Sequence, residues 1–365
     1  MKIIGFVCDT PLQIFNCINI ACNSFGGEEY KKILYVGMIF KNSEEIVSRL
    51  KETSVFDEIY CFKEVITVIE KSVILRGRSL VTPKSVLKKF CMDDGLVSFK
   101  FDCLFVNMLN YFTRLVMFAN KYNELVEYED GIGNYIDNTF DYSVLSPLAR
   151  ILNKIYNGKL MPRTEKIYLN CVGGYKNKNK KQVYAIRSLN DNNIALNYIK
   201  RVFDYDDTSS LYKDNKIVFL SQVVDYDEVK TQQIEHKFLD SIISEYRDII
   251  VRYHPRQKLE KSDKYPSDES CSMWEIECFE NIDENTILIN SCSTAAFMPV
   301  MLANKKPYVI FVFEYFKQFY PEYMISNIYK MFELIKEYYA EDREKIVILK
   351  PEEDIVACIN AIRKG

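Results

Sequence analysis

The sequence is poor in the residues that build metal centres. Its 365 residues include only two histidines, and its 11 cysteines form no Cys-x-x-Cys pair. Because structural zinc sites need Cys and His ligands at close spacing, these counts argue against such a site. The odd number of cysteines, several of them inside apolar strands, predicts buried free thiols in a reducing compartment.

Long apolar runs and an excess of positive charge are also missing. The longest apolar stretches, such as residues 294–303, have half of the roughly 20 residues that span a bilayer. No signal-peptide pattern precedes the first strand, so we expect a cytoplasmic protein, with peripheral contact at the inner face of the cytoplasmic membrane as a further expectation. Acidic residues outnumber basic ones by 51 to 48, so we expect no general affinity for nucleic acid.

The sequence does contain a regular alternation of strands and helices. Residues 2–8 form an apolar strand, and Thr10 with Pro11 then satisfies the rules for a helix start. Further strands are predicted at 33–37, 58–62, 102–107 and 124–129, separated by helices at 43–53, 84–92 and 109–121. This alternation predicts a parallel sheet with helices on both faces.

A basic run follows the first series. Residues 158–181 are irregular and end in a cluster of Lys176, Lys178, Lys180 and Lys181, between helices expected at 142–156 and 191–203. We interpret the cluster as a solvated loop. The alternative is a rim that attracts an anionic acceptor or lipid headgroups.

A second series begins after a polar segment at 204–210, which we interpret as a linker. It contains a helix at 226–246, a final helix at 352–363, and strands at 216–221, 248–254, 286–290, 307–313 and 346–349. We therefore predict an α/β protein with two doubly wound, Rossmann-like domains facing each other across a cleft. The domains span 1–204 and 211–365, and the final helix is expected to pack back on the N-terminal domain.

The strand at 124–129 runs into an acidic loop, Glu129-Asp130-Gly131. Gly131 lets the backbone turn away from the strand, and open α/β sheets bind ligands beyond the carboxyl ends of their strands. Both carboxylates are therefore expected at the lip of the sheet, where a catalytic acid or base would lie. The alternative is a surface turn, because Asp-Gly is a common turn dipeptide.

The strand at 248–254 ends in a His-Pro pair between two arginines, Arg252 and Arg256. Pro255 cannot continue a central strand, so His254 lies at the carboxyl end. Side chains alternate along a strand, so Arg252 and His254 share a face that suits a phosphate or another anion. The alternative is solvated arginines beside an ordinary half-buried histidine.

The strand at 286–290 runs into Ser291, Ser293 and Thr294, which precede a helix start. Their hydroxyls and the helix N–H groups suit a phosphate, whereas capping alone explains one hydroxyl. Ser221, at the end of the strand at 216–221, is assigned to the same nucleotide side. These second-domain residues and the acidic loop of the first domain form the predicted site.

Together these loops suit the one-step displacement of a glycosyl phosphate. The departing phosphate accumulates negative charge while an acceptor hydroxyl loses its proton on the opposite face of the sugar. Asp130 would take that proton, and His254 with Ser293 would stabilise or protonate the phosphate. None of the three loops contains Asp-x-Asp, so we expect no metal or other cofactor. Asp9 and Thr10 would receive part of the sugar, unless they only cap the first helix.

These motifs, in this order, resemble those of the bacterial sialyltransferases of glycosyltransferase family 52, the lipooligosaccharide and capsule sialyltransferases. The likeness lies in residues 129–134 (Glu-Asp-Gly-Ile-Gly-Asn), 254–257 (His-Pro-Arg-Gln) and 291–294 (Ser-Cys-Ser-Thr). Residues 8–13 (Cys-Asp-Thr-Pro-Leu-Gln) are also similar to the family's first strand-to-helix turn. Short motifs carry this resemblance, which spans nearly the whole chain.

The resemblance implies a GT-B architecture, a CMP-sialic acid donor, inversion at the anomeric carbon, a galactose-type acceptor on an oligosaccharide or lipid-linked glycan, and a homodimer. It makes Asp130 the general base, and it places Glu275 on the ribose or base of the nucleotide. The other substrate-side residues are Asp9, Thr10, Gln13, Glu129 and Gly131. The nucleotide side comprises Ser221, Arg252, His254, Pro255, Arg256, Glu275, Ser291, Ser293 and Thr294.

Three alternatives stay open. Family 52 also has members that resemble this chain and transfer a hexose from a UDP-sugar. CDP-glycerol phosphotransferases likewise place His-Pro and Ser/Thr loops around a cytidine nucleotide, although the loop at 129–134 argues against them. A binding module without turnover is the third, and the presence of both Asp130 and His254 argues against it.

Overall fold

The chain divides into two compact units, Met1–Asp204 and Tyr205–Gly365. The boundary falls in the polar segment that we interpreted as a linker. The computed structural model describes residues 1–63, 65–107, 110–131, 133–136, 151, 153–155, 159, 162–175, 181–189, 193–206, 208, 210–222, 228–254, 263–270 and 272–364. The helix expected at 142–156 lies mostly outside these residues.

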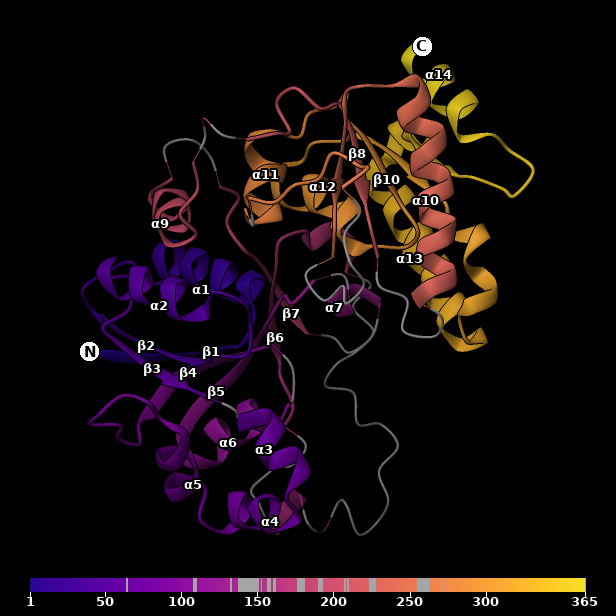
Figure 1. Ribbon diagram of the computed structural model, residues 1–365. Coiled ribbons are helices and arrows are strands. Elements are labelled where there is room, and N and C mark those ends of the chain that lie inside the picture. The colour runs from indigo at the N-terminus through magenta and orange to yellow at the C-terminus, as the bar shows by residue number, and fades with distance from the viewer. Residues whose placement is uncertain are drawn as a thin grey trace. The chain divides into compact units, whose positions relative to one another are not determined.

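The first unit is built on a seven-stranded parallel sheet (Figure 1). Its strands are β1 (Lys2–Cys8), β2 (Tyr30–Gly37), β3 (Glu58–Phe62), β4 (Lys100–Val106), β5 (Lys121–Tyr128), β6 (Lys166–Leu169) and β7 (Gln182–Ala185). The order β3-β2-β1-β4-β5-β6-β7 reverses direction between β1 and β4. This is the Rossmann order, and ligands of such sheets bind at the reversal, beyond the carboxyl ends of the strands. The predicted parallel sheet is confirmed, but β6 and β7 were not predicted.

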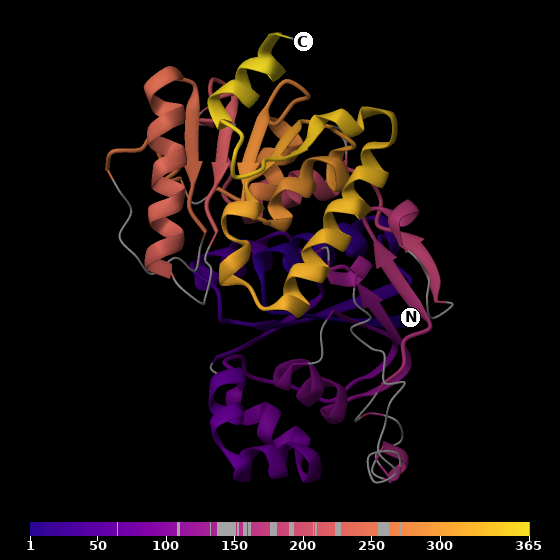
Figure 2. The same cartoon turned by 90° about the vertical axis from the view of Figure 1, so that its right-hand side faces the viewer.

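Helices cover both faces of this sheet (Figures 1 and 2). On one face lie α1 (Pro11–Ser24), α2 (Ser43–Glu52) and α9 (Ile194–Val202), and on the other α3 (Val65–Lys71), α4 (Val73–Val81), α5 (Pro83–Phe90) and α6 (Tyr111–Ala119). The predicted helix start is confirmed, because the Thr10 side chain accepts from the Gln13 N–H and Pro11 begins α1. The short helices α3 and α4 were not predicted.

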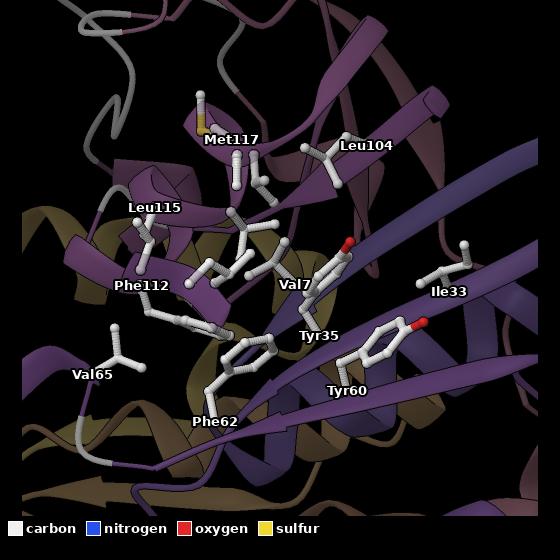
Figure 3. Close-up of a cluster of buried hydrophobic side chains, with 14 of the residues drawn as sticks. Val7, Ile33, Tyr35, Tyr60, Phe62, Val65, Leu104, Phe112, Leu115 and Met117 are labelled. Atoms are coloured by element: carbon white, nitrogen blue, oxygen red, sulfur yellow. The ribbon is translucent and has the colours of Figure 1, made fainter. Parts of the chain in front are cut away.

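The core of the first unit is rich in aromatic side chains (Figure 3). Tyr35, Phe62 and Phe112 gather between the sheet and α6, with ring centroids of Tyr35 and Phe62 5.9 Å apart and those of Phe62 and Phe112 5.2 Å apart. Neighbouring residues of β1 serve opposite faces, since Val7 joins this cluster while Phe6 contacts Phe25 just beyond α1. A strand with both faces buried requires a continuous apolar run, which is what the sequence of β1 shows.

The second unit has a five-stranded parallel sheet in the order β12-β11-β10-β8-β9. Its strands are β8 (Ile217–Leu220), β9 (Ile249–Arg252), β10 (Ile287–Asn290), β11 (Tyr308–Phe311) and β12 (Ile346–Ile348). All five were predicted to within three residues at each end. The order is that of the flavodoxin-like sheets, with its reversal between β8 and β10.

The helices of the second unit also cover both faces of their sheet. They are α10 (Glu228–Glu245), α11 (Trp274–Glu280), α12 (Met298–Ala303), α13 (Glu322–Tyr339) and α14 (Ile355–Lys364). On β11, Ile310 joins the cluster formed with α10 and α14, whereas the Phe311 ring lies 4.2 Å from that of Phe332 on α13. The final helix α14 contacts α10, and the Tyr246 hydroxyl donates to Oδ1 of Asn360 at 2.9 Å.

The described cysteines are free thiols, five of them buried and five half-buried. Cys271 is the one cysteine outside the described residues. Among the helices that the structure describes, none combines the length and apolar character that crossing a bilayer would require.

Candidate active site

The end of β5 brings acidic side chains to the carboxyl edge of the first sheet. Glu127 and Glu129 are both buried, with 2% and 0% of their surface exposed, while Asp130 is half-buried. Glu129 directly follows β5 beside Asp130, as expected, but its side chain is buried whereas that of Asp130 is partly accessible. The Tyr135 hydroxyl and the Asn170 N–H, both at 2.6 Å, donate to Oε2 of Glu129.

Burial affects the protonation of Glu129 strongly. It raises the pKa of this carboxyl to about 7, although the donors from Tyr135 and Asn170 act in the opposite direction. Its Oε1 atom is buried and meets no hydrogen-bond partner among the described residues. Glu129 thus supports the loop from within, with no described contact that would place it on a substrate.

The loop after Glu129 turns back on itself. Gly131 has a φ of 107°, in the left-handed region that favours glycine, and a Cβ atom there would meet nothing within 4 Å. Glycine is therefore required for the backbone angle and not for space. The turn lets the Asp130 N–H donate to Oδ1 of Asn134 at 2.7 Å.

Gln13 orients the Asp130 side chain. Its Oε1 accepts from the Asp9 N–H at 2.7 Å, and its Nε2 donates to Oδ1 of Asp130, also at 2.7 Å. Because the Asp9 N–H holds the oxygen end of the Gln13 amide, the NH₂ end faces Asp130 and donates to its carboxylate. Gln13 is buried, and its hydrogen bonds hold the Asp130 carboxylate in place, whereas the sequence had suggested a direct contact with substrate.

Asp130 has the electrostatics of a base that works near neutral pH. Burial raises its pKa to about 6, the negative charge of Asp9 adds to the rise, and the Gln13 amide lowers it. At neutral pH the carboxylate form prevails, yet it remains basic enough to accept a proton in a transition state.

Asp9 lies at the reversal point of the first sheet. It follows β1, it is buried, and the Asn110 side-chain amide, which comes from the loop after β4, donates to its Oδ2. Burial raises the pKa of Asp9, against the effect of the donors from Asn110 and Gln13. We had not identified Asn110, because an Asn before a helix is normally explained as a cap; it does cap α6, accepting from the Thr113 N–H at 2.9 Å.

A buried ion pair between Lys181 and Glu127 supports the acidic loop. Nζ of Lys181 lies 2.5 Å from Oε2 of Glu127, and both side chains are buried. Oε1 of Glu127 accepts from the side-chain amide of Asn134 at 3.0 Å, and Asn134 in turn accepts from the Asp130 N–H. Interpreting Lys181 as part of a solvated basic loop was therefore wrong; the other lysines of that run lie outside the described residues.

In the second unit, Ser221 directly follows β8 at the reversal point of the sheet. Its hydroxyl donates to Oε2 of Glu235 at 2.7 Å, and the N–H of Gln222 donates to Oε1 of the same carboxyl at 3.0 Å. Glu235 comes from α10 and was not identified from the sequence, where it looks like one of several charged residues of a surface helix. Burial raises its pKa to about 7, and the two donors oppose this rise.

The raised pKa of Glu235 predicts a pH dependence of stability. Between the ordinary value of 4.5 and about 7, the folded state keeps a proton that the unfolded chain releases, so the free energy of unfolding falls as pH rises through this window. A shift of this size corresponds to a loss on the order of 3 kcal/mol. Glu235→Gln should remove that part of the decline, measured by urea unfolding at about pH 5 and about pH 8.

Glu245→Gln is the matched control, because Glu245 is exposed on the same helix. It should leave the difference between the two pH values as in the wild type. An equal decline in wild type and Glu235→Gln would show that Glu235 titrates normally.

The loop after β10 has an amide at its base and hydroxyls at its rim. Asn290 is fully buried; its Oδ1 accepts from the Ser293 N–H at 2.7 Å, while its Nδ2 has no partner among the described residues. Ser293 and Thr294 are half-buried, and Ser293 Oγ accepts from the Ala295 N–H at 3.2 Å. Ser291, which we also assigned to the phosphate, is buried.

The residues at the end of β9 and directly after it differ in their roles. His254 is half-buried at the strand end, as predicted, whereas Pro255 and Arg256 lie outside the described residues. Nη1 of Arg252 lies 2.6 Å from a carboxylate oxygen of Asp268 and donates to the Tyr212 hydroxyl at 2.9 Å. The Arg252 guanidinium is thus already paired, which favours a structural role over the phosphate contact that we inferred.

Glu275 lies in the first turn of α11 and is half-buried. Burial raises its pKa, and the positive charge of Arg252 partly offsets the rise. The preceding residue, Trp274, donates from its indole to the Ala295 carbonyl at 2.7 Å, which ties α11 to the loop after β10. No set of three or more His, Cys, Asp or Glu side chains arranged to hold a metal occurs in the part of the chain that the structure describes.

No protein-family model and no curated protein matches this sequence. Among solved structures, the GT-B domain of a sialyltransferase from Photobacterium damselae is similar to the chain, with a TM-score of 0.51 and 8% identity over 95% of this chain and 100% of that one. The chain has a GT-B fold. The predicted fold class, two Rossmann-like units, is thereby confirmed.

Two further structures are similar at lower TM-scores. One is a 2,6-sialyltransferase of Vibrionaceae Photobacterium sp. JT-ISH-224, with a TM-score of 0.48 and 11% identity over 95% of this chain and 78% of that one. The other is a UDP-N-acetylglucosamine 2-epimerase, with a TM-score of 0.48 and 14% identity over 100% of this chain and 94% of that one. At these identities the similarity concerns the fold alone.

Proposed function

We propose that this protein is an inverting sialyltransferase that moves sialic acid from CMP-sialic acid to a galactose-type terminal sugar of a bacterial surface glycan. The observation that carries the proposal is Asp130. In a chain with a GT-B fold, this carboxyl lies at the carboxyl edge of the first sheet, is oriented by Gln13, and has a pKa raised to about 6. The motif resemblance to family 52 supports the choice of donor.

In the proposed reaction, an acceptor hydroxyl attacks the anomeric carbon of sialic acid. The new C–O bond forms as the bond from that carbon to the phosphate oxygen breaks, and the electron pair leaves with CMP. The hydroxyl proton passes to a carboxylate oxygen of Asp130. Gln13 would hold the carboxylate for this transfer, because its amide donates to Oδ1 and leaves Oδ2 for the acceptor.

The charge that develops on the leaving phosphate would be stabilised by the second unit. His254 would donate a proton or a hydrogen bond, and Ser293 and Thr294 would donate from their hydroxyls. Asn290 supports this assignment, because its buried Nδ2 has no partner among the described residues and lies at the base of the same loop. A buried donor of this kind gains from a bound acceptor. Glu275 would hold the ribose or base of the nucleotide.

The proposal predicts transfer without a divalent metal. Wild-type protein is incubated with CMP-N-acetylneuraminic acid and a lactose-type acceptor in the presence of EDTA, and CMP release and sialylated lactose are measured together. We expect both products in equal amounts, and a rate at least about tenfold lower for His254→Ala.

Different outcomes of this experiment would reject different parts of the proposal. Turnover only after Mg²⁺ or Mn²⁺ is added would reject metal independence. Turnover with a UDP-sugar or CDP-glycerol, but none with the sialic acid donor, would reject the donor. An unchanged rate for His254→Ala would remove this histidine from the leaving-phosphate site.

A further inference from the structure

Helix α4 exposes large apolar side chains to solvent. Val73, Ile74 and Val81 are 72%, 76% and 77% exposed, and none of the nine residues of this helix is buried. A lone exposed apolar residue is ordinary, but three on one short helix form a patch that calls for an explanation.

These side chains share one face of the helix. At about 100° per residue, Val73, Ile74, Gly77 and Val81 fall within a single arc of about 100°. Arg76 and Arg78 lie on the two sides of that arc, and both are exposed. The outward face is thus an apolar stripe bordered by arginines, the arrangement of helices that lie in a membrane interface.

The surroundings of α4 are strongly basic. The segment 71–92 contains six lysines and arginines and no acidic residue, whereas the whole chain has a net charge of −3. The six are Lys71, Arg76, Arg78, Lys84, Lys88 and Lys89, and all are exposed. No ion pair joins any of the six to another residue that the structure describes.

The inner side of α4 is attached to the first unit. Leu75 packs against the main aromatic core, and the Ser72 hydroxyl caps the helix by accepting from the Leu75 N–H at 3.3 Å. The helix contacts α3, α5 and α6, and Figure 1 shows it on the outer side of this layer, farther from the strands than α6. The stripe is therefore held in a defined position and faces away from the sheet.

We propose that α4, with the basic face of α5, docks on an anionic lipid bilayer. Val73, Ile74 and Val81 enter the boundary between headgroups and acyl chains, and the arginines and lysines contact lipid phosphates. The excess of positive charge in the segment 71–92 favours lipid over a second copy of the chain, because a second copy would bring the same positive segment against this one. The inference goes beyond the proposed transfer reaction and does not depend on it.

Vesicle co-sedimentation tests the proposal with the full chain. The bound fraction is measured with phosphatidylcholine vesicles and with phosphatidylcholine vesicles that contain phosphatidylglycerol, at low and at high salt. We expect binding to the anionic vesicles only, weakened by salt. Hydrogen exchange in the presence of vesicles should slow at the amides of α4 and α5.

Two variants separate the contributions. Arg76→Glu with Arg78→Glu should lower the partition coefficient at least about tenfold, and Val73→Ser with Ile74→Ser should lower it while the dependence on phosphatidylglycerol persists. The matched control is Arg343→Glu with Lys350→Glu, which changes the net charge equally at two exposed positions of the second unit. We expect it to bind as the wild type does.

Equal loss in the control, or no binding to anionic vesicles, would overturn the assignment of α4 as a lipid-docking helix. So would a concentration-dependent dimer in light scattering that disappears with Val73→Ser and Ile74→Ser, because the stripe would then be a protein interface. Circular dichroism of each variant establishes that the fold is retained.

Discussion

Asp130→Asn should lower kcat/KM by about 10²- to 10⁴-fold, the range expected when a general base is lost. The substitution keeps an oxygen that can accept from the Gln13 amide, so the loop should retain its shape. What it removes is the ability to take the acceptor proton. Steady-state kinetics with CMP-N-acetylneuraminic acid, and donor binding by calorimetry, would show a lost rate with binding retained.

The pH profile gives an independent test of the same group. In the wild type, kcat/KM should rise with pH through about 6, because the raised pKa keeps Asp130 protonated and inactive as a base below that value. Asp94→Asn serves as the control, since Asp94 is exposed in the same unit. If Asp130→Asn retains a rate close to that of Asp94→Asn, Asp130 is not the base.

Lys181→Met should destabilise the protein by about 3–5 kcal/mol, because it leaves Glu127 buried without its cation. The side chains of Lys181 and Glu127 are only 4% and 2% exposed, so water cannot replace the lost partner. The measurement is the free energy of unfolding in urea near neutral pH. Adding Glu127→Gln to this variant should restore part of the stability, because the uncompensated charge is then gone.

Lys166→Met is the matched control for this ion pair. Lys166 lies 2.7 Å from Glu124 in the same sheet, but their side chains are 31% and 36% exposed, so the loss should stay below about 1 kcal/mol. Similar losses in the two variants would mean that burial does not increase the contribution of the Lys181–Glu127 pair to the free energy of unfolding. If Lys181→Met also lowers kcat/KM in a folded protein, the path from Glu127 through Asn134 to the Asp130 N–H carries that effect.

The strand positions were accessible to sequence reasoning because local physics decides them. The apolar run at β1 needs burial on both faces, and Thr10 with Pro11 can begin a helix only where the strand has ended. The same reasoning placed Asp130 directly after its strand and His254 at the carboxyl end of the strand predicted at 248–254. It could not find β6 and β7, which have four residues each and carry too little pattern to be distinguished from a loop.

The roles of several side chains were hidden for a different reason. Lys181 in the sequence is one lysine among four, and Glu235 is one charged residue on a long helix; each becomes distinctive only when a distant partner is brought to it. Gln13 was identified, but as a substrate contact, because its link to Asp130 spans 117 positions of the chain. Contacts between residues so far apart in the chain produce no local pattern in the sequence.

By itself, the sequence determined the alternating α/β architecture, the two units and the edge of each sheet at which the polar loops lie. It could do so because apolar periodicity, capping residues and chain breakers act within a few positions of one another. Only the tertiary structure decided which carboxylates are buried, which cations are already paired, and which helix is left with an apolar face in water. Those outcomes depend on the burial and electric field created by residues far away in the chain, and these exist only once the chain has folded.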